Sequence, residues 1–121
     1  MSNQELVFLS AANLASEIKN KQISPVEAVE AYLDRINHVD PKLNAYITVL
    51  ADKALEAAHQ SESDITSGVN KGSLHGVPVA VKDQIYTKGI RTSSASKIRS
   101  GFVPDFDATV VNGLKRSGAI I

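Results

Sequence analysis

The sequence predicts an α/β fold in which residues 1–73 are mostly helical and residues 74–121 form a strand, a loop, a helix and a second strand. Two patterns indicate this division. Apolar residues in the first part recur at helical spacing, whereas Val77–Val81 is a continuous apolar run of strand length. A strand followed by a helix and another strand is the order of a parallel crossover. Because the second strand starts only at Ala119, we expect residues 1–121 to be the N-terminal part of a single domain, cut off within its sheet.

Two helices open the chain, and a serine introduces each. Ser10 can cap a helix that places Leu14 and Ile18 on one apolar face. The run Ser24-Pro25-Val26-Glu27 has a cap residue, a proline at the first helical position and a glutamate that can return a hydrogen bond. Asp40-Pro41 should end this second helix, because proline disfavours helical geometry in the residue before it.

The middle of the chain predicts a short extended segment, a helix and a loop. Residues 45–50 are rich in β-forming side chains, and the stretch Ala51–Ala58 then has alanine and leucine at helical spacing. The polar run Gln60–Ser73 contains serines, a threonine and two glycines, which favour turns. We expect it to be a surface connection, with a frayed end of the preceding helix as the alternative at its start.

The predicted first strand ends at Lys82-Asp83-Gln84, and a loop rich in serine, glycine and basic residues covers Thr87–Ser100. Loops of this length in compact domains are often functional. Asp107 is expected to cap the next helix, which has Lys115 and Arg116 in its last turn, where they complement the helix dipole.

Composition excludes several classes of function. Thirteen basic residues balance thirteen acidic ones, so no overall field would hold the chain on nucleic acid or on an anionic membrane. The chain has no cysteine, which fits a cytoplasmic protein and leaves only oxygen nucleophiles. No apolar stretch approaches the ~20 residues that span a bilayer, and residues 1–9 lack the basic and apolar pattern of a leader peptide, so we expect neither secretion nor membrane insertion. The spacing of the histidines suits no metal site, and we expect no cofactor.

Lys82 is the first candidate for chemistry, because open α/β sheets usually bind their ligands at the carboxyl ends of their strands. Partial burial there would disfavour the charged form of the amine and make it a usable base. The alternative is a lysine that reaches the surface and pairs with Asp83. Position alone leaves both interpretations open.

The residues around Lys82 resemble the amidase signature family. Leu74–Asp83 is similar to the segment of that family in which two apolar residues flank a proline before valine or isoleucine and lysine-aspartate. Thr87–Thr92 resembles the glycine-containing approach to a threonine, and Asp107–Val111 resembles the start of the following helix. Upstream, Ser24–Glu27 and Leu43–Tyr46 resemble the N-terminal helices. Several motifs in the same order make the resemblance specific.

The resemblance implies an enzyme that cleaves a carbon–nitrogen bond of a small amide through a Ser-cisSer-Lys triad on a mixed sheet covered by helices. Lys82 corresponds to the lysine of that triad, which takes the proton of the bridging serine, which in turn activates the nucleophile. The glycine-serine block that carries both serines lies downstream of Ile121. We therefore expect the isolated chain to be poorly folded and inactive on amides.

Two hydroxyl side chains near Lys82 are candidates for the substrate side. The family's equivalent of the loop at Thr92–Ser96 borders the substrate cleft, which makes Ser93 and Ser94 substrate-binding candidates by resemblance. The alternative is a hydrogen-bonding turn without any contact to substrate. Many family members have an alanine-glycine pair where this chain has Ser94-Ala95. For Asp83, we expect a side chain that holds the turn after it through backbone N–H groups.

Three functional interpretations follow. The first is a free-standing cytoplasmic amidase. The second is the glutaminase subunit of a tRNA-dependent amidotransferase, because Ala95-Ser96-Lys97 resembles a run often found in that subunit. Only this second interpretation requires companion subunits. The third is a small non-catalytic α/β interaction domain that ends naturally at Ile121.

Overall fold

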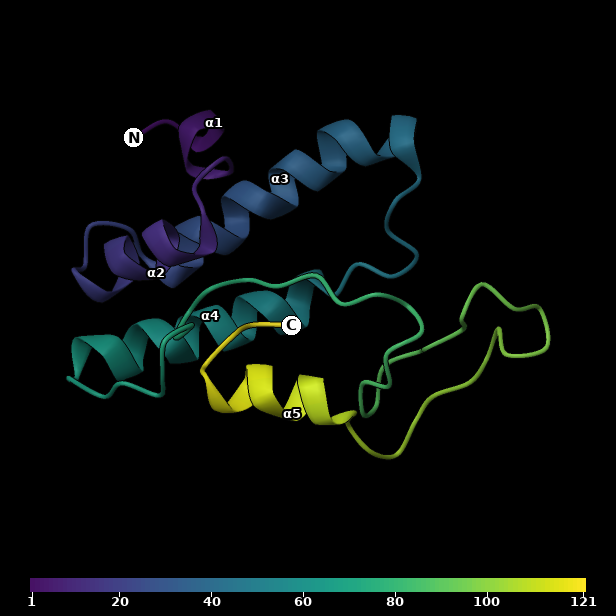
Figure 1. Cartoon of the computed structure of the whole chain (residues 1–121). Helices are drawn as coiled ribbons and strands as arrows, with labels where there is room; N and C mark the ends of the chain where they lie inside the picture. The colour runs from purple at the N-terminus through teal and green to yellow at the C-terminus, as the bar shows by residue number, and fades with distance from the viewer.

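The computed structural model describes all residues, 1–121, and its regular secondary structure is helical. Figure 1 shows α3 and α4 beside each other, with α5 below them and a long loop (green) that extends away from the helices. No helix is long and apolar enough to cross a membrane. The helices are α1 (Asn3–Leu6), α2 (Ala11–Lys19), α3 (Pro25–Leu43), α4 (Ala51–Thr66) and α5 (Thr109–Arg116).

Both predicted N-terminal caps are confirmed. The Ser10 hydroxyl accepts a hydrogen bond from the backbone N–H of Asn13 at 3.1 Å. At the start of α3, the Ser24 hydroxyl accepts from the N–H of Glu27 at 3.0 Å, and the Glu27 carboxylate accepts from the N–H of Ser24 at 3.5 Å. These bonds satisfy N–H groups that have no partner within a helix. Both helices therefore begin where local chemistry predicts.

The expectation that Asp40-Pro41 ends α3 is wrong, because the helix continues to Leu43 with Pro41 inside its last turn. Asn44 then adopts a left-handed conformation with φ 52° and donates its N–H to the carbonyl of Asp40 at 2.7 Å. The Asp40 carboxylate also accepts from the N–H of Ala45 at 2.7 Å. These bonds stabilise the end of α3 after the proline.

Helix α4 is longer than the sequence predicts, since it includes Gln60–Thr66, which we expected to be a loop. The Gln60 side chain donates to the carboxylate of Asp64 one turn later at 2.9 Å. Ser61 is buried although its side chain is polar, and it lies on the same helical face as Ala54 and Ala58. The apolar face of α4 thus runs past the point where the sequence turns polar.

The predicted sheet is reduced to a single parallel bridge between Pro78 and Ile120. The N–H of Ile120 donates to the carbonyl of Val77 at 2.9 Å, and the N–H of Val79 donates to the carbonyl of Ile120 at 2.8 Å. The parallel direction of the predicted crossover is therefore confirmed. A strand covered on both faces is not observed, because the described residues provide only these two extended segments and Ala80 is exposed.

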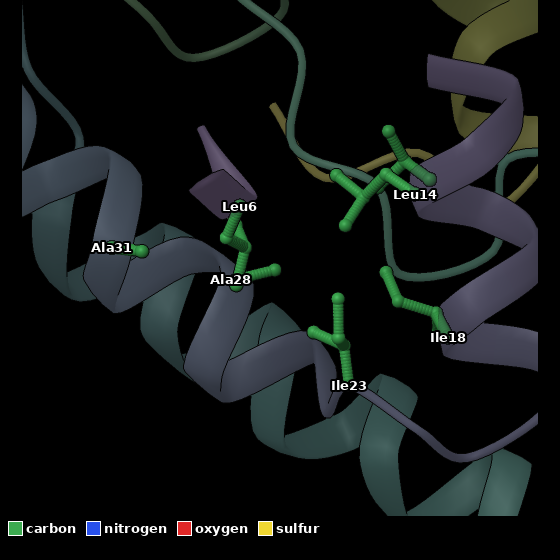
Figure 2. Packing of buried hydrophobic residues seen from close by; sticks show 7 residues of the cluster. Leu6, Leu14, Ile18, Ile23, Ala28 and Ala31 are labelled. Atoms are coloured by element: carbon green, nitrogen blue, oxygen red, sulfur yellow. The ribbon is translucent and has the colours of Figure 1, made fainter. Parts of the chain in front are cut away.

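The core joins the extended segments to the helices. Figure 2 shows Leu14 and Ile18 of α2 pointing toward Ile23, Ala28 of α3 and Leu6 of α1. Val77 belongs to this cluster, and a second cluster joins α3, α4 and the C-terminal segment through its buried members Val29, Ala58 and Ile120. Burial of the leucine, isoleucine and valine side chains among them contributes roughly 1.5–3 kcal/mol each. Through Val77 and Ile120, the packing holds both extended segments against the helices.

The predicted cap of α5 is also wrong, because the N-cap residue is Ala108 and no side chain caps this helix. The Asp107 carboxylate instead accepts from the backbone N–H of Lys88 at 2.7 Å and from the ammonium of Lys115 at 2.7 Å. The hydrogen bond from Lys115 is the main reason that the pKa of Asp107 lies below its ordinary value. Asp107 therefore ties the long loop to the last turn of α5.

Candidate active-site groove

A mainly hydrophobic groove of about 780 Å³ lies where the parallel bridge meets the long loop. Its walls come from one face of α3, from residues 45–50, from residues 78–85 and from residues 90–92, 94 and 95, with Ile120 and Ile121 at one end. These segments are far apart in the sequence, so tertiary packing creates the groove. Lys82 is the one lysine among the lining residues.

Lys82 lies at the groove, and its side chain is exposed. The partial burial that we expected from the sequence is thus not observed within residues 1–121. The alternative pairing with Asp83 is not observed either, because Lys82 takes part in none of the ion pairs. Its amine is free to interact with a group that enters the groove.

The Asp83 side chain points to the loop ten residues later. One carboxylate oxygen, Oδ1, accepts from the backbone N–H of Ser93 at 3.0 Å, and Oδ2 accepts from the Ser93 hydroxyl. The hydrogen bond from the Ser93 hydroxyl is the main reason that the pKa of Asp83 lies below its ordinary value. The expectation that Asp83 binds backbone N–H groups is confirmed, although its partner lies in the loop and not in the adjacent turn.

The two predicted serines lie in different surroundings. Ser93 is buried, with its hydroxyl donating to Asp83, and it does not line the groove. Ser94 is exposed, lines the groove and donates its N–H to the carbonyl of Asp83 at 2.8 Å. The structure thus brings Lys82 and Ser94 to one groove and holds Ser93 behind it.

Sequence reasoning missed an aromatic cluster that braces the loop. The Arg99 guanidinium lies 4.4 Å from the ring centroid of Phe102 and 5.4 Å from that of Tyr86, and it donates to the Tyr86 hydroxyl. The Tyr86 ring also packs against Phe106, with ring centroids 5.3 Å apart. Such cation–π and aromatic contacts stabilise loops. The sequence signal that could have predicted this cluster is the presence of three aromatic residues in an otherwise polar loop.

His75 is buried just before the first extended segment. Its Nδ1 accepts the backbone N–H of Lys71 at 3.2 Å, and its Nε2 lies 3.9 Å from a carboxylate oxygen of Asp64. Burial is the main reason that the pKa of His75 lies below its ordinary value. His75 therefore stabilises the turn that precedes the first extended segment. His38 and His59 are exposed, and no three potential metal ligands lie together.

The arrangement of these helices around a parallel crossover recurs in solved amidase structures. The peptide amidase from Stenotrophomonas maltophilia superposes with a TM-score of 0.85 and 32% sequence identity, covering 93% of this chain and 23% of that chain. The fold therefore defines an amidase-type segment. A family model described as Amidase matches residues 27–121, and the chain belongs to the amidase signature family.

The chain is also similar in sequence to curated amidotransferase subunits. The chain is 50% identical over 117 residues to the A-type subunit of the glutamyl-tRNA(Gln) amidotransferase of Geobacter metallireducens, covering 97% of this chain and 24% of that protein. It is 47% identical over 116 residues to the corresponding protein of Carboxydothermus hydrogenoformans, covering 96% of this chain and 24% of that protein. The chain spans about a quarter of the length of these relatives.

Proposed function

We propose that this chain supplies the lysine of a Ser-cisSer-Lys triad that cleaves the carbon–nitrogen bond of a small amide. The observation that carries the proposal is the position of Lys82 at the carboxyl end of the first extended segment, facing an apolar groove. A lysine in its neutral form accepts a proton from a hydroxyl group, which is the activation that an oxygen nucleophile requires.

Residues 1–121 act in this proposal as the N-terminal part of a single amidase domain. Residues 1–73 supply the helical cover, and residues 74–121 supply the first crossover of a mixed sheet. Further strands beside the bridge between Pro78 and Ile120 would cover the groove and remove water from Lys82. A drier surrounding favours the neutral amine that the reaction needs. The exposure of Lys82 in this segment is consistent with a site that other parts of the domain complete.

Ser93 and Ser94 remain the substrate-side candidates. The support for Ser94 is its exposed side chain on the wall of the groove that holds Lys82. The support for Ser93 is indirect, because its hydroxyl is bonded to Asp83 and only its neighbours reach the groove. A direct contact between Ser93 and substrate would require this hydrogen bond to open.

Within this chemistry, we favour the glutaminase subunit of a cytoplasmic amidotransferase, which releases ammonia from glutamine in a complex with companion subunits. The support is the identity of 47% and 50% to the amidotransferase proteins, compared with 32% to the peptide amidase. The run Ala95-Ser96-Lys97 agrees with this interpretation. A free-standing amidase is the second candidate, and the fold shared with the peptide amidase supports it.

A full-length chimera tests the role of Lys82. In this chimera, residues 1–121 replace the matching segment of the Geobacter metallireducens relative, and the protein is assembled with the companion subunits of that relative. We expect Lys82→Ala to lower glutamine and small-amide turnover about a thousandfold or more, since loss of a member of a catalytic triad has effects of this order. Lys53→Ala, on an exposed surface of α4, is the control. Undiminished turnover in Lys82→Ala would refute the assignment.

Co-purification separates the two candidates. The glutaminase component of an amidotransferase should form a stable stoichiometric complex with its companion subunits and hydrolyse glutamine within it. A free-standing amidase should hydrolyse small amides equally well alone. Co-purification of the natural full-length protein that contains residues 1–121, followed by both assays, decides between them, because the chimera would take most of its subunit contacts from the amidotransferase relative.

A further inference from the structure

Two consecutive residues on the groove wall have a left-handed backbone. Ser94 has φ 52° and Ala95 has φ 54°, and neither is a glycine. A side chain with a Cβ atom disfavours this region of backbone conformation. A strained turn of this kind persists when its surroundings hold it, and such turns concentrate at functional sites.

Asp83 makes the bonds that hold this turn. Its carboxylate accepts from both the N–H and the hydroxyl of Ser93, and its own carbonyl accepts the N–H of Ser94 at 2.8 Å. Ser93 is 5% exposed, so its hydroxyl is shielded from competing water. Asp83 follows Lys82 in the sequence, and its side chain binds Ser93, the residue that precedes the left-handed turn. These hydrogen bonds therefore link the turn to the segment that carries Lys82.

We propose that Asp83 is a positioning residue that acts through Ser93 to fix the turn Ser94-Ala95 as a wall of the groove beside Lys82. This inference rests on the proposed amidase function. Asp83 touches neither substrate nor the reacting atoms in this role. Its loss lets the turn relax, which changes the shape of the groove and weakens substrate binding.

The alternative role for Asp83 is electrostatic, because a carboxylate beside a lysine favours the charged amine. The geometry favours positioning, since both carboxylate oxygens bind Ser93 and neither pairs with Lys82. The two roles differ in what Asp83→Asn does. Asparagine keeps an oxygen acceptor for the Ser93 N–H and offers an amide donor to its hydroxyl, but it carries no charge.

Steady-state kinetics of the full-length chimera with its companion subunits test the proposal. We expect Asp83→Ala to raise KM about tenfold or more with a smaller change in kcat, because small displacements in a binding site have effects of this size. With Asp83→Asn, KM should remain close to the parent value, and the pH profile of kcat/KM should be unchanged. Asp105→Ala, which removes an exposed acid of the same loop that forms no hydrogen bond or ion pair, is the control.

Relief of the backbone strain at the turn provides a second test of the proposal. If Asp83 holds a strained turn, Ala95→Gly in the Asp83→Ala background should lower KM part of the way back to the parent value, because glycine adopts positive φ without a Cβ penalty. An Asp83→Asn variant as impaired as Asp83→Ala, with a displaced pH profile, would overturn positioning in favour of the electrostatic role. An Asp83→Ala variant with unchanged KM would overturn it as well.

Limited trypsin digestion reports on the loop independently of activity, since Arg91, Lys97 and Arg99 are trypsin sites around the turn. We expect faster cleavage of this loop in Asp83→Ala and cleavage at the original rate in Asp83→Asn and in the Asp105→Ala control. Equal rates in all variants would refute the positioning role even if the chimera lacked amidase activity. Full turnover in Lys82→Ala would instead refute the proposed function alone.

Discussion

The backbone of Gly118 lies directly against the backbone of His75, so that a Cβ atom on Gly118 would approach the His75 Cα to 2.7 Å. The N–H of Gly76 donates to the carbonyl of Gly118 at 3.0 Å, which places this contact beside the parallel bridge. The crossover from α5 to the last extended segment therefore requires a residue without a side chain at position 118.

Gly118→Ala should lower the free energy of unfolding of the full-length chimera by at least about 2 kcal/mol, because it adds a backbone clash to an unfavourable φ of +85°. Gly89→Ala has φ +73° and open space around it, so we expect a cost of only about 1 kcal/mol. Gly113→Ala lies within α5 in open space and should stabilise by about 0.5–1 kcal/mol. Denaturant unfolding of the three variants gives the order, and equal effects at positions 118 and 89 would contradict the packing argument.

Acid should weaken the contact between His75 and the segment around Lys71. His75 Nδ1 accepts an N–H group, so protonation of this nitrogen breaks the bond and charges a buried ring beside the Lys71 ammonium and the Asp64 carboxylate. The pKa of His75 is lowered by folding, so its contribution to stability is present above the unfolded value of about 6.5 and is lost as pH falls below it.

His75→Asn is the matched variant for this prediction, because its amide oxygen can accept the Lys71 N–H and does not titrate. We expect the Tm of the parent chimera to fall more steeply than that of His75→Asn between about pH 6.5 and pH 5. Thermal unfolding followed by circular dichroism at matched ionic strength measures the difference. Parallel curves would show that His75 does not carry the pH dependence.

Ala95→Gly should stabilise the loop in the otherwise unchanged protein. The φ of Ala95 is 54°, and removal of its Cβ relieves roughly 1 kcal/mol of the cost of a left-handed residue. The greater freedom of glycine in the unfolded chain offsets part of this gain. The measurement is hydrogen exchange of the loop amides in the chimera, which should slow relative to the parent. Faster exchange would contradict the strain argument.

Leu14→Ala should destabilise the protein by about 2–5 kcal/mol, because Leu14 is fully buried in the cluster that joins α1, α2 and α3. Leu43→Ala removes the same atoms from a largely exposed side chain at the end of α3, so we expect a change within about 0.5 kcal/mol. Denaturant midpoints of the two chimeras provide the comparison. A similar loss in both would show that the helical cluster does not form as described.

Local chemistry allowed the starts of α2 and α3 to be predicted. The Ser10 and Ser24 caps depend only on residues within one turn, so the sequence is sufficient to place them. The family resemblance around Lys82 likewise depends on a contiguous run, Leu74–Asp83, and the amidase match confirms it. The sequence by itself therefore determined where α2 and α3 begin, the direction of the crossover and the family of the protein.

Only the tertiary structure decided the features that join distant residues. Asp107 binds Lys88 and Lys115 across the fold and so does not cap α5, which no local rule could show. The bonds between Asp83 and Ser93 and the groove beside Lys82 depend on how the loop folds back on the first extended segment. A hydrogen bond within one helical turn follows from the spacing of residues along the chain, whereas a contact between separate segments exists only after packing has set their distance.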